Sequence, residues 1–205
     1  MKTLLYPFCR SITIGLMHKK YPNVKFHIHC CDSIEALERM QNDKCDFIFI
    51  PYIDHDIKSL YSNMLLPLRS AWGYLISKNS PLAAMDGMRF PDIKNIPLLV
   101  PESFFNDRAS LDWMRNFTED MNIIGTYNTI SGCCDLINEN RCIALAHCFS
   151  ADSYEDADLC FHQILPTSSY MIWKNNASLS LSARIFMSYF EEVACEKAAE
   201  NTTVG

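Results

Sequence analysis

The fold of this chain is decided by three successive stretches: Tyr21-Pro22-Asn23-Val24-Lys25-Phe26-His27-Ile28, Ser33-Ile34-Glu35-Ala36-Leu37 and Asp46-Phe47-Ile48-Phe49-Ile50. Pro22 ends a preceding helix, because a residue before proline avoids helical angles, and the alternation after it indicates a half-buried strand. A capping-box pattern then begins a helix. The last stretch is continuously apolar, which predicts a strand buried on both faces. Strand, helix and strand in this order predict a right-handed βαβ unit.

The rest of the chain continues the alternation. Strands are predicted over 2–6, 71–77, 96–100, 123–127, 142–146, 159–164 and 170–174, and helices over 12–21, 109–117, 132–138 and from Ser182 onward. We expect turn-like structure at 7–11, a loose segment over 52–67, and a link through Pro166 between the last two strands. Because β and α segments alternate before and after Leu75, the sequence predicts an α/β fold class with two Rossmann-like lobes. Lobe I comprises 1–74 and 170–199, lobe II comprises 75–169, and 200–205 is a frayed tail.

Composition excludes several classes of protein. With 18 basic against 24 acidic residues, the net charge is −6, which disfavours direct contact with DNA. No apolar run approaches the ~18 residues that span a bilayer, and Pro7 and Arg10 interrupt the first apolar stretch, so no signal peptide is expected. The ten cysteines include no CxxC pair, which predicts reduced packing cysteines and a cytoplasmic protein. Neither a zinc site nor a cofactor is predicted.

Several motifs in order resemble the effector-binding domain of LysR-type transcriptional regulators. They are Tyr21-Pro22-Asn23-Val24, Ser33 with Met40 and Asp46, Ser80-Pro81-Leu82-Ala83, Cys142-Ile143-Ala144-Leu145-Ala146-His147 and Leu179-Ser180-Leu181-Ser182-Ala183. The resemblance covers about 7–196. Three positions depart from it: Asp43 replaces a glycine, Asn140-Arg141-Cys142 replaces a glycine-rich turn, and His147 replaces a proline.

The resemblance implies a type 2 periplasmic-binding-protein-like fold, with two Rossmann-like lobes joined by two crossing strands near Leu75 and Ser169. It also implies that the domain binds a small-molecule effector between its lobes and so controls DNA-dependent transcription. DNA would be contacted only through a winged helix-turn-helix that this chain lacks. It also implies a homodimer or homotetramer, for which helix 12–20 and the outer face of strand 24–29 are the candidate surfaces.

Ligands of open α/β sheets bind beyond the carboxyl ends of strands, where helix N-termini offer free N–H groups. That rule selects Ser11, Tyr52, Ser103, Thr129, Ser131 and His147, and the resemblance adds Ser33, Pro51, Asn106 and Ile130 as effector contacts. The alternative for each serine is plain helix capping, and the alternative for His147, the commoner role of such a residue, is a hydrogen-bonded interior histidine. Helix N-termini favour a small carboxylate as effector, and a redox signal sensed by Cys142 or Cys148 is the rival.

Catalysis is not expected, because neither a G-x-S-x-G elbow nor a glycine-rich phosphate loop occurs. Two other classes remain open on the same fold: a solute-binding protein of a transport system and a lyase.

Overall fold

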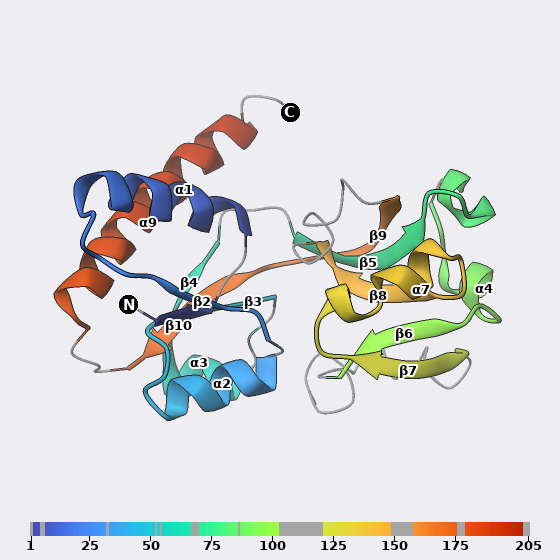
Figure 1. Ribbon diagram of the computed structural model, residues 1–205, viewed down its shortest axis with the longest axis horizontal. Helices are drawn as coiled ribbons and strands as arrows, with labels where there is room; N and C mark the ends of the chain where they lie inside the picture. Colours follow the sequence, from blue (N-terminus) through green and yellow to red (C-terminus); the bar gives the residue numbers. More distant parts are fainter. Residues whose placement is uncertain are drawn as a thin grey trace. The chain divides into compact units, whose positions relative to one another are not determined.

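A computed structural model describes residues 2–4, 7–31, 33–51, 53, 55–66, 70–85, 87–102, 121–148, 158–175 and 179–202. The chain divides into two compact units (Figure 1). Unit 1 comprises Met1–Arg69 and Ser168–Gly205, and unit 2 is the intervening Ser70–Thr167. The sequence predicts lobe boundaries after residues 74 and 169.

Unit 1 contains two small sheets. β1 (Lys2–Leu4) pairs in parallel with β2 (His27–His29), and β10 (Tyr170–Lys174) pairs antiparallel with both β3 (Ile48–Ile50) and β4 (Tyr61–Leu65). All three residues of β3 are buried, as the continuous apolar run predicts.

Helices cover both faces of the β3-β10-β4 sheet. α1 (Pro7–Lys20) and α9 (Leu181–Thr202) lie side by side on one face, and α2 (Ser33–Gln41) and α3 (His55–Leu60) lie on the other (Figure 1). The period-2 alternation of strands divides the side chains between these layers. Phe47, Phe49 and Met171 pack under α1 and α9, whereas Ile48, Ile50 and Ile172 pack under α2 and α3.

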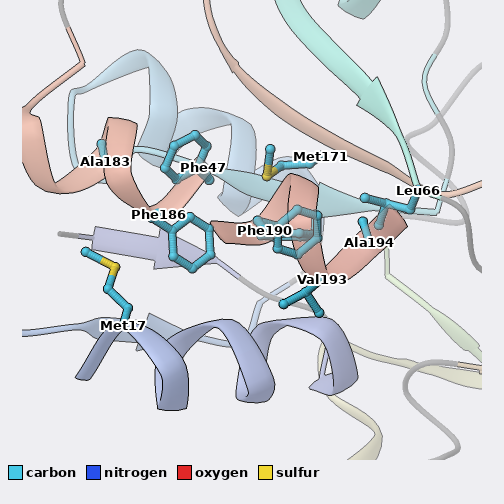
Figure 2. Close-up of a cluster of buried hydrophobic side chains, with 10 residues drawn as sticks. Met17, Phe47, Leu66, Met171, Ala183, Phe186, Phe190, Val193 and Ala194 are labelled. Atoms are coloured by element: carbon cyan, nitrogen blue, oxygen red, sulfur yellow. The ribbon is translucent and has the colours of Figure 1, made fainter. Parts of the chain in front are cut away.

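The long helix α9 supplies much of the core of unit 1. Figure 2 shows Phe186 and Phe190 on successive turns of α9, facing Phe47 and Met171 of the sheet. The ring centroids of Phe47 and Phe186 are 5.3 Å apart, and those of Phe49 and Phe190 are 5.1 Å apart. Ser180 caps the helix, since its Oγ accepts a 3.1 Å hydrogen bond from the Ala183 amide.

Unit 2 is built on one five-stranded sheet of order β7-β6-β8-β5-β9. The strands are β5 (Ser70–Ser77), β6 (Leu98–Pro101), β7 (Ile123–Tyr127), β8 (Ile143–His147) and β9 (Leu159–Thr167). β6, β7 and β8 are mutually parallel, and β5 is antiparallel to both of its neighbours. One face carries η1 (Pro81–Ala84) and α4 (Phe90–Ile93), and the other carries η2 (Ile130–Gly132) and α7 (Cys134–Asn138).

Gly73 of β5 allows an unusually close approach of β9. The pairing of these strands shifts register between Trp72 and Gly73, and a Cβ atom at Gly73 would overlap the carbonyl oxygen of His162 and the ring of Phe161. A glycine is therefore required by the contact itself.

Several expected elements differ from the observed ones. Residues 7–11 are helical, because Pro7 occupies the first helical position, where its fixed φ and missing N–H cost nothing. The segment 52–67, expected to be loose, contains α3 and β4. The described part of α9 runs to Thr202 rather than fraying from residue 200. The predicted helix 109–117 lies outside the described residues.

Other differences concern strand ends. Pro166 lies inside β9 rather than linking two strands, which an edge strand tolerates because one side of its backbone makes no ladder bonds. The strands expected over 24–29 and 45–50 are shorter, with ladders only at 27–29 and 48–50. Val24 and Phe26 nevertheless pack against the core beneath α9.

Within the residues that the structure covers, no helix is both long and apolar enough to cross a membrane. Nine of the ten cysteines form no disulfide in the structure: Cys30, Cys31, Cys45, Cys133, Cys134, Cys142, Cys148, Cys160 and Cys195.

Candidate functional site

The parallel strands of unit 2 bring polar groups to one sheet edge. β6, β7 and β8 end at Pro101, Tyr127 and His147, and the carboxyl ends of parallel strands share an edge. The Glu102 amide donates a 2.8 Å hydrogen bond to the Tyr127 carbonyl, which joins the ends of β6 and β7. This edge is where the strand-end rule expects a ligand.

Thr129, Ile130 and Ser131 follow β7 at this edge. Thr129 stands at the N-cap of η2, yet its side chain makes no capping hydrogen bond. Its Oγ1 lies 3.2 Å from Oγ of the exposed Ser131. Ile130 is buried, and its carbonyl accepts bonds from the Cys133 thiol at 3.1 Å and the Cys134 thiol at 3.3 Å. Ile130 therefore anchors the turn, whereas the two hydroxyls remain on its outer side.

His147 lies in the interior of unit 2. It is 4% exposed, and burial lowers the pKa of its imidazole to about 3, so the ring is neutral near pH 7. The ring packs edge-on against Trp72 of β5, with centroids 5.4 Å apart at 85°. A neutral, buried imidazole supplies no positive charge for a carboxylate.

Cys148 adjoins this histidine. Its Sγ lies 3.9 Å from Nδ1 of His147 and accepts a 3.3 Å hydrogen bond from the Ala71 amide. Cys142 and Cys148, the two residues considered for redox sensing, stand at opposite ends of β8. Six extended residues separate their Cα atoms by about 20 Å, far beyond the ~7 Å that a disulfide allows. They cannot form a disulfide with each other in this fold.

The thiols behind η2 have low reactivity. Burial raises the pKa of Cys133 to about 12 and also raises the pKa of Cys134 and Cys142. High pKa values keep these groups protonated, and a thiol reacts with oxidants chiefly as its thiolate. These cysteines pack the core.

Of the site residues predicted in unit 1, Ser33 lies at a helix start and Ser11 does not. Ser33 is the first residue of α2 and is half-buried, and Pro51 directly follows β3. In Figure 1, α2 begins on the side of unit 1 toward which β3 runs. Ser11, expected at a helix start, is instead inside α1. Tyr52, Ser103 and Asn106 lie outside the described residues.

The helices before the two most buried strands end in the same backbone motif. After α2, the Asp43 amide bonds to the Met40 carbonyl (3.1 Å) and the Lys44 amide to the Arg39 carbonyl (2.8 Å). After α7, Asn140 and Arg141 make the equivalent bonds to Ile137 (2.9 Å) and Leu136 (3.0 Å). Each is a Schellman motif. Its left-handed residue is Asp43 (φ 56°) or Asn140 (φ 57°), at the two places where the sequence departs from glycine.

Lys174 of β10 secures the end of α2. Its Nζ donates to the Asp43 carboxylate at 2.5 Å and to the Gln41 carbonyl at 3.0 Å. Sequence reasoning missed this contact, because 131 residues separate Lys174 from Asp43. It also missed Trp72 and Tyr127, whose hydroxyl donates a 2.6 Å hydrogen bond to the Leu145 carbonyl. Tyr127 ends its strand, which was the available signal, whereas Trp72 is the third residue of β5.

Among the described side chains, no group of three or more histidine, cysteine, aspartate or glutamate residues could hold a metal ion.

Comparison with known proteins identifies the fold. The family model described as "LysR substrate binding domain" matches residues 13–195. Three solved structures of low identity share the fold. The regulatory domain of CcmR from Synechocystis PCC6803, in complex with 2-PG, has a TM-score of 0.77 at 13% identity, covering 94% of this chain and 95% of that one.

The effector-binding domain of QuiR in complex with shikimate has a TM-score of 0.70 at 13% identity, covering 95% of each chain. The effector-binding domain of a BenM variant has a TM-score of 0.70 at 14% identity, and the match covers 96% of this chain and 95% of the BenM chain. No curated protein sequence matches the chain.

Proposed function

This chain belongs to the LysR substrate-binding domain family, and from that premise we propose that it binds a small-molecule effector and transmits its binding to transcription. The match of the family over 13–195 is the observation that carries the proposal, since it spans both units. A sensor works by binding its effector more tightly in one conformation than in another, and only that difference in affinity shifts a population.

The proposed contacts are Ser33 in unit 1 and Thr129 to Ser131 in unit 2. Ser33 opens a helix, where free backbone N–H groups and the helix dipole favour an anion. The Thr129 and Ser131 hydroxyls add donors that no helix cap uses. Small acids fit these donors, and two of the comparison structures, those of QuiR and CcmR, are complexes with shikimate and 2-PG. With His147 neutral, hydroxyl and amide donors carry the recognition at this edge of unit 2.

Calorimetric titration tests the assignment. The panel contains shikimate, 2-PG and other small aromatic and aliphatic acids. For an acid that binds, Ser33→Leu should weaken affinity by roughly 5- to 150-fold, since a hydrogen-bond donor lost without replacement costs about 1–3 kcal/mol. Ser188→Leu is the matched control, an exposed serine of α9 whose hydroxyl bonds only its own helix. Equal affinity of wild type and Ser33→Leu would make Ser33 part of the helix alone.

We further propose that the domain releases its effector unchanged. The Cys148 thiol and His147 imidazole resemble a nucleophile and base, but burial leaves this imidazole a very weak base. Chromatography of each binding acid after prolonged incubation should recover it intact. A product whose formation stops in a single-residue variant would favour the lyase alternative.

Self-association into a homodimer or homotetramer completes the proposal, with any contact to DNA left to a separate helix-turn-helix domain. Supporting it, α1 and β2 expose apolar side chains at Leu16 (42%) and Ile28 (46%). Sedimentation velocity should show an oligomer that Leu16→Glu or Ile28→Glu dissociates. A monomer at high concentration would contradict the proposed surface.

A further inference from the structure

Asp43 holds a backbone conformation that glycine would adopt more easily. At φ 56° it lies in the left-handed region, where an L-residue with a Cβ is disfavoured and aspartate and asparagine are tolerated best. An aspartate at this position adds a carboxylate that glycine lacks. This carboxylate makes a 2.5 Å ion pair with Lys174.

Lys174 binds the end of α2 twice. The same ammonium that pairs with Asp43 also donates to the carbonyl of Gln41, the last residue of the helix. Carbonyls at a helix C-terminus have no intrahelical partner and carry the negative end of the dipole, so a cation is favoured there. The contact joins the helix terminus to a neighbouring strand.

The strand that supplies Lys174 also supports the body of the helix. Ile172, two residues before Lys174 in β10, packs in one buried cluster with Ala36 and Met40 of α2. Thus α2 is held against β10 along its apolar face and at its C-terminal end. Nine helical residues form a rod about 13 Å long, so fixing one end orients the other. The other end is Ser33.

We propose that Lys174 is a positioning residue for the effector site: by binding Gln41 and Asp43 together, it sets where the N-terminal end of α2 and Ser33 lie. The effect of Lys174 on effector binding rests on the proposed function, but its contact with the end of α2 does not. Lys174 contributes little to global stability, because the Asp43 side chain is 83% exposed and exposed ion pairs are weak. Its effect is on helix position.

Three variants test this inference in the intact chain without any effector. Lys174→Met removes the ammonium and keeps the aliphatic stem. Asp43→Gly removes the carboxylate and relieves the left-handed strain, so it does not destabilise the fold in general. Asn140→Gly is the matched control, since it makes the same backbone change after α7.

The measurement is NMR of backbone amides, with hydrogen exchange. In Lys174→Met, exchange of the Leu37 to Gln41 amides should accelerate by roughly twofold, as expected for a weak exposed ion pair. The Ser33 amide resonance should shift in the same direction in Lys174→Met and Asp43→Gly. Asn140→Gly should leave α2 unaltered. A resonance of Ser33 that does not move in either variant would overturn the proposal, because the ion pair would then act only locally. A change in Asp43→Gly without one in Lys174→Met would also overturn it.

Effector titration adds the functional arm. With an acid that binds wild type, Lys174→Met should weaken affinity by roughly threefold while Ser188→Leu does not. If α2 responds to the variants but no acid of the panel binds, the proposed function fails and the positioning of α2 stands.

Discussion

In unit 1 the helix before the buried strand β3 is followed by the left-handed residue Asp43, and in unit 2 the helix before β8 is followed by the left-handed residue Asn140. The hydrogen bonds and the φ values are nearly the same, but the Asp43 side chain is ionically paired to β10. The layers differ as well. Phenylalanines of α9 fill one face of unit 1, whereas smaller leucine, isoleucine, alanine and cysteine side chains fill the face of unit 2 beneath η2 and α7. The same helix-terminating backbone motif therefore occurs with and without an ion pair to a neighbouring strand. We expect substitutions in the two units to change stability by different amounts.

The largest expected effect is in the aromatic layer of unit 1. Phe186 is fully buried between Phe47 and Phe190, so Phe186→Ala should lower the free energy of unfolding by about 3–5 kcal/mol. Urea denaturation measures this. Leu181→Ala, at a 67% exposed position of the same helix, should change it by less than about 0.5 kcal/mol. Equal effects of the two variants would mean that α9 does not form this core.

Unit 2 should be most sensitive where its strands approach closely. Gly73→Ala forces a Cβ atom against the His162 carbonyl, and we expect a loss of up to about 3 kcal/mol, as for other overpacked sites. Gly15→Ala, in α1 with no atom within 4 Å of the new Cβ, should instead stabilise by about 0.5–1 kcal/mol. A neutral Gly73→Ala would indicate that β9 readily moves away from β5.

The buried imidazole of unit 2 predicts a dependence on pH. Because the pKa of His147 is lowered to about 3 in the folded state, only the unfolded chain takes up this proton between about pH 6.5 and 3. Its stabilising contribution is complete above pH 6.5 and declines as pH falls, by at most about 1.4 kcal/mol per pH unit. Denaturation of wild type and His147→Gln from pH 7 to 5 measures it. Parallel curves for the two proteins would contradict a neutral His147.

The smallest expected effect is at the two left-handed residues, Asp43 and Asn140, that end the compared motifs. Asn140→Gly relieves left-handed strain and should stabilise by about 0.5 kcal/mol. Asp43→Gly relieves the same strain but loses the Lys174 pair, so its net gain should be smaller by a few tenths of a kcal/mol. Thermal melts of both variants, and of Asp43→Gly combined with Lys174→Met, isolate the pair. Identical gains at both positions would show that the pair adds no stability.

Local patterns in the sequence predicted the elements that bury a face. The continuous apolar runs at β3 and β8 and the capped helix α2 were recognised because each has a strong periodic signal. α3 was missed because none of its residues is buried, so it has no apolar periodicity. Long-range contacts were beyond such patterns: the pairing of Lys174 with Asp43 and of Trp72 with His147 depends on strand order.

The candidate site divides in the same way. Ser33 and Thr129 to Ser131 follow strand ends, as the sequence indicated, and their role in effector binding stays a prediction. Ser11 was placed at a helix start because the residues before it looked like a turn, whereas Pro7 begins the helix. His147 was correctly placed at the end of β8, but its burial depends on β5 and could not be read from its neighbours in sequence.

The interleaving of the chain has a consequence for biosynthesis. Unit 1 needs Phe186 and Phe190 of α9 for its core, so the ribosome must deliver nearly the whole chain before that core can close. Unit 2 is continuous from Ser70 to Thr167, and its two ends meet through a 2.8 Å hydrogen bond from the Ser70 hydroxyl to the Thr167 carbonyl. The unit that begins second is therefore the first that can be completed during translation. The N-terminal segment must wait, with β3 exposed, for the last helix to emerge.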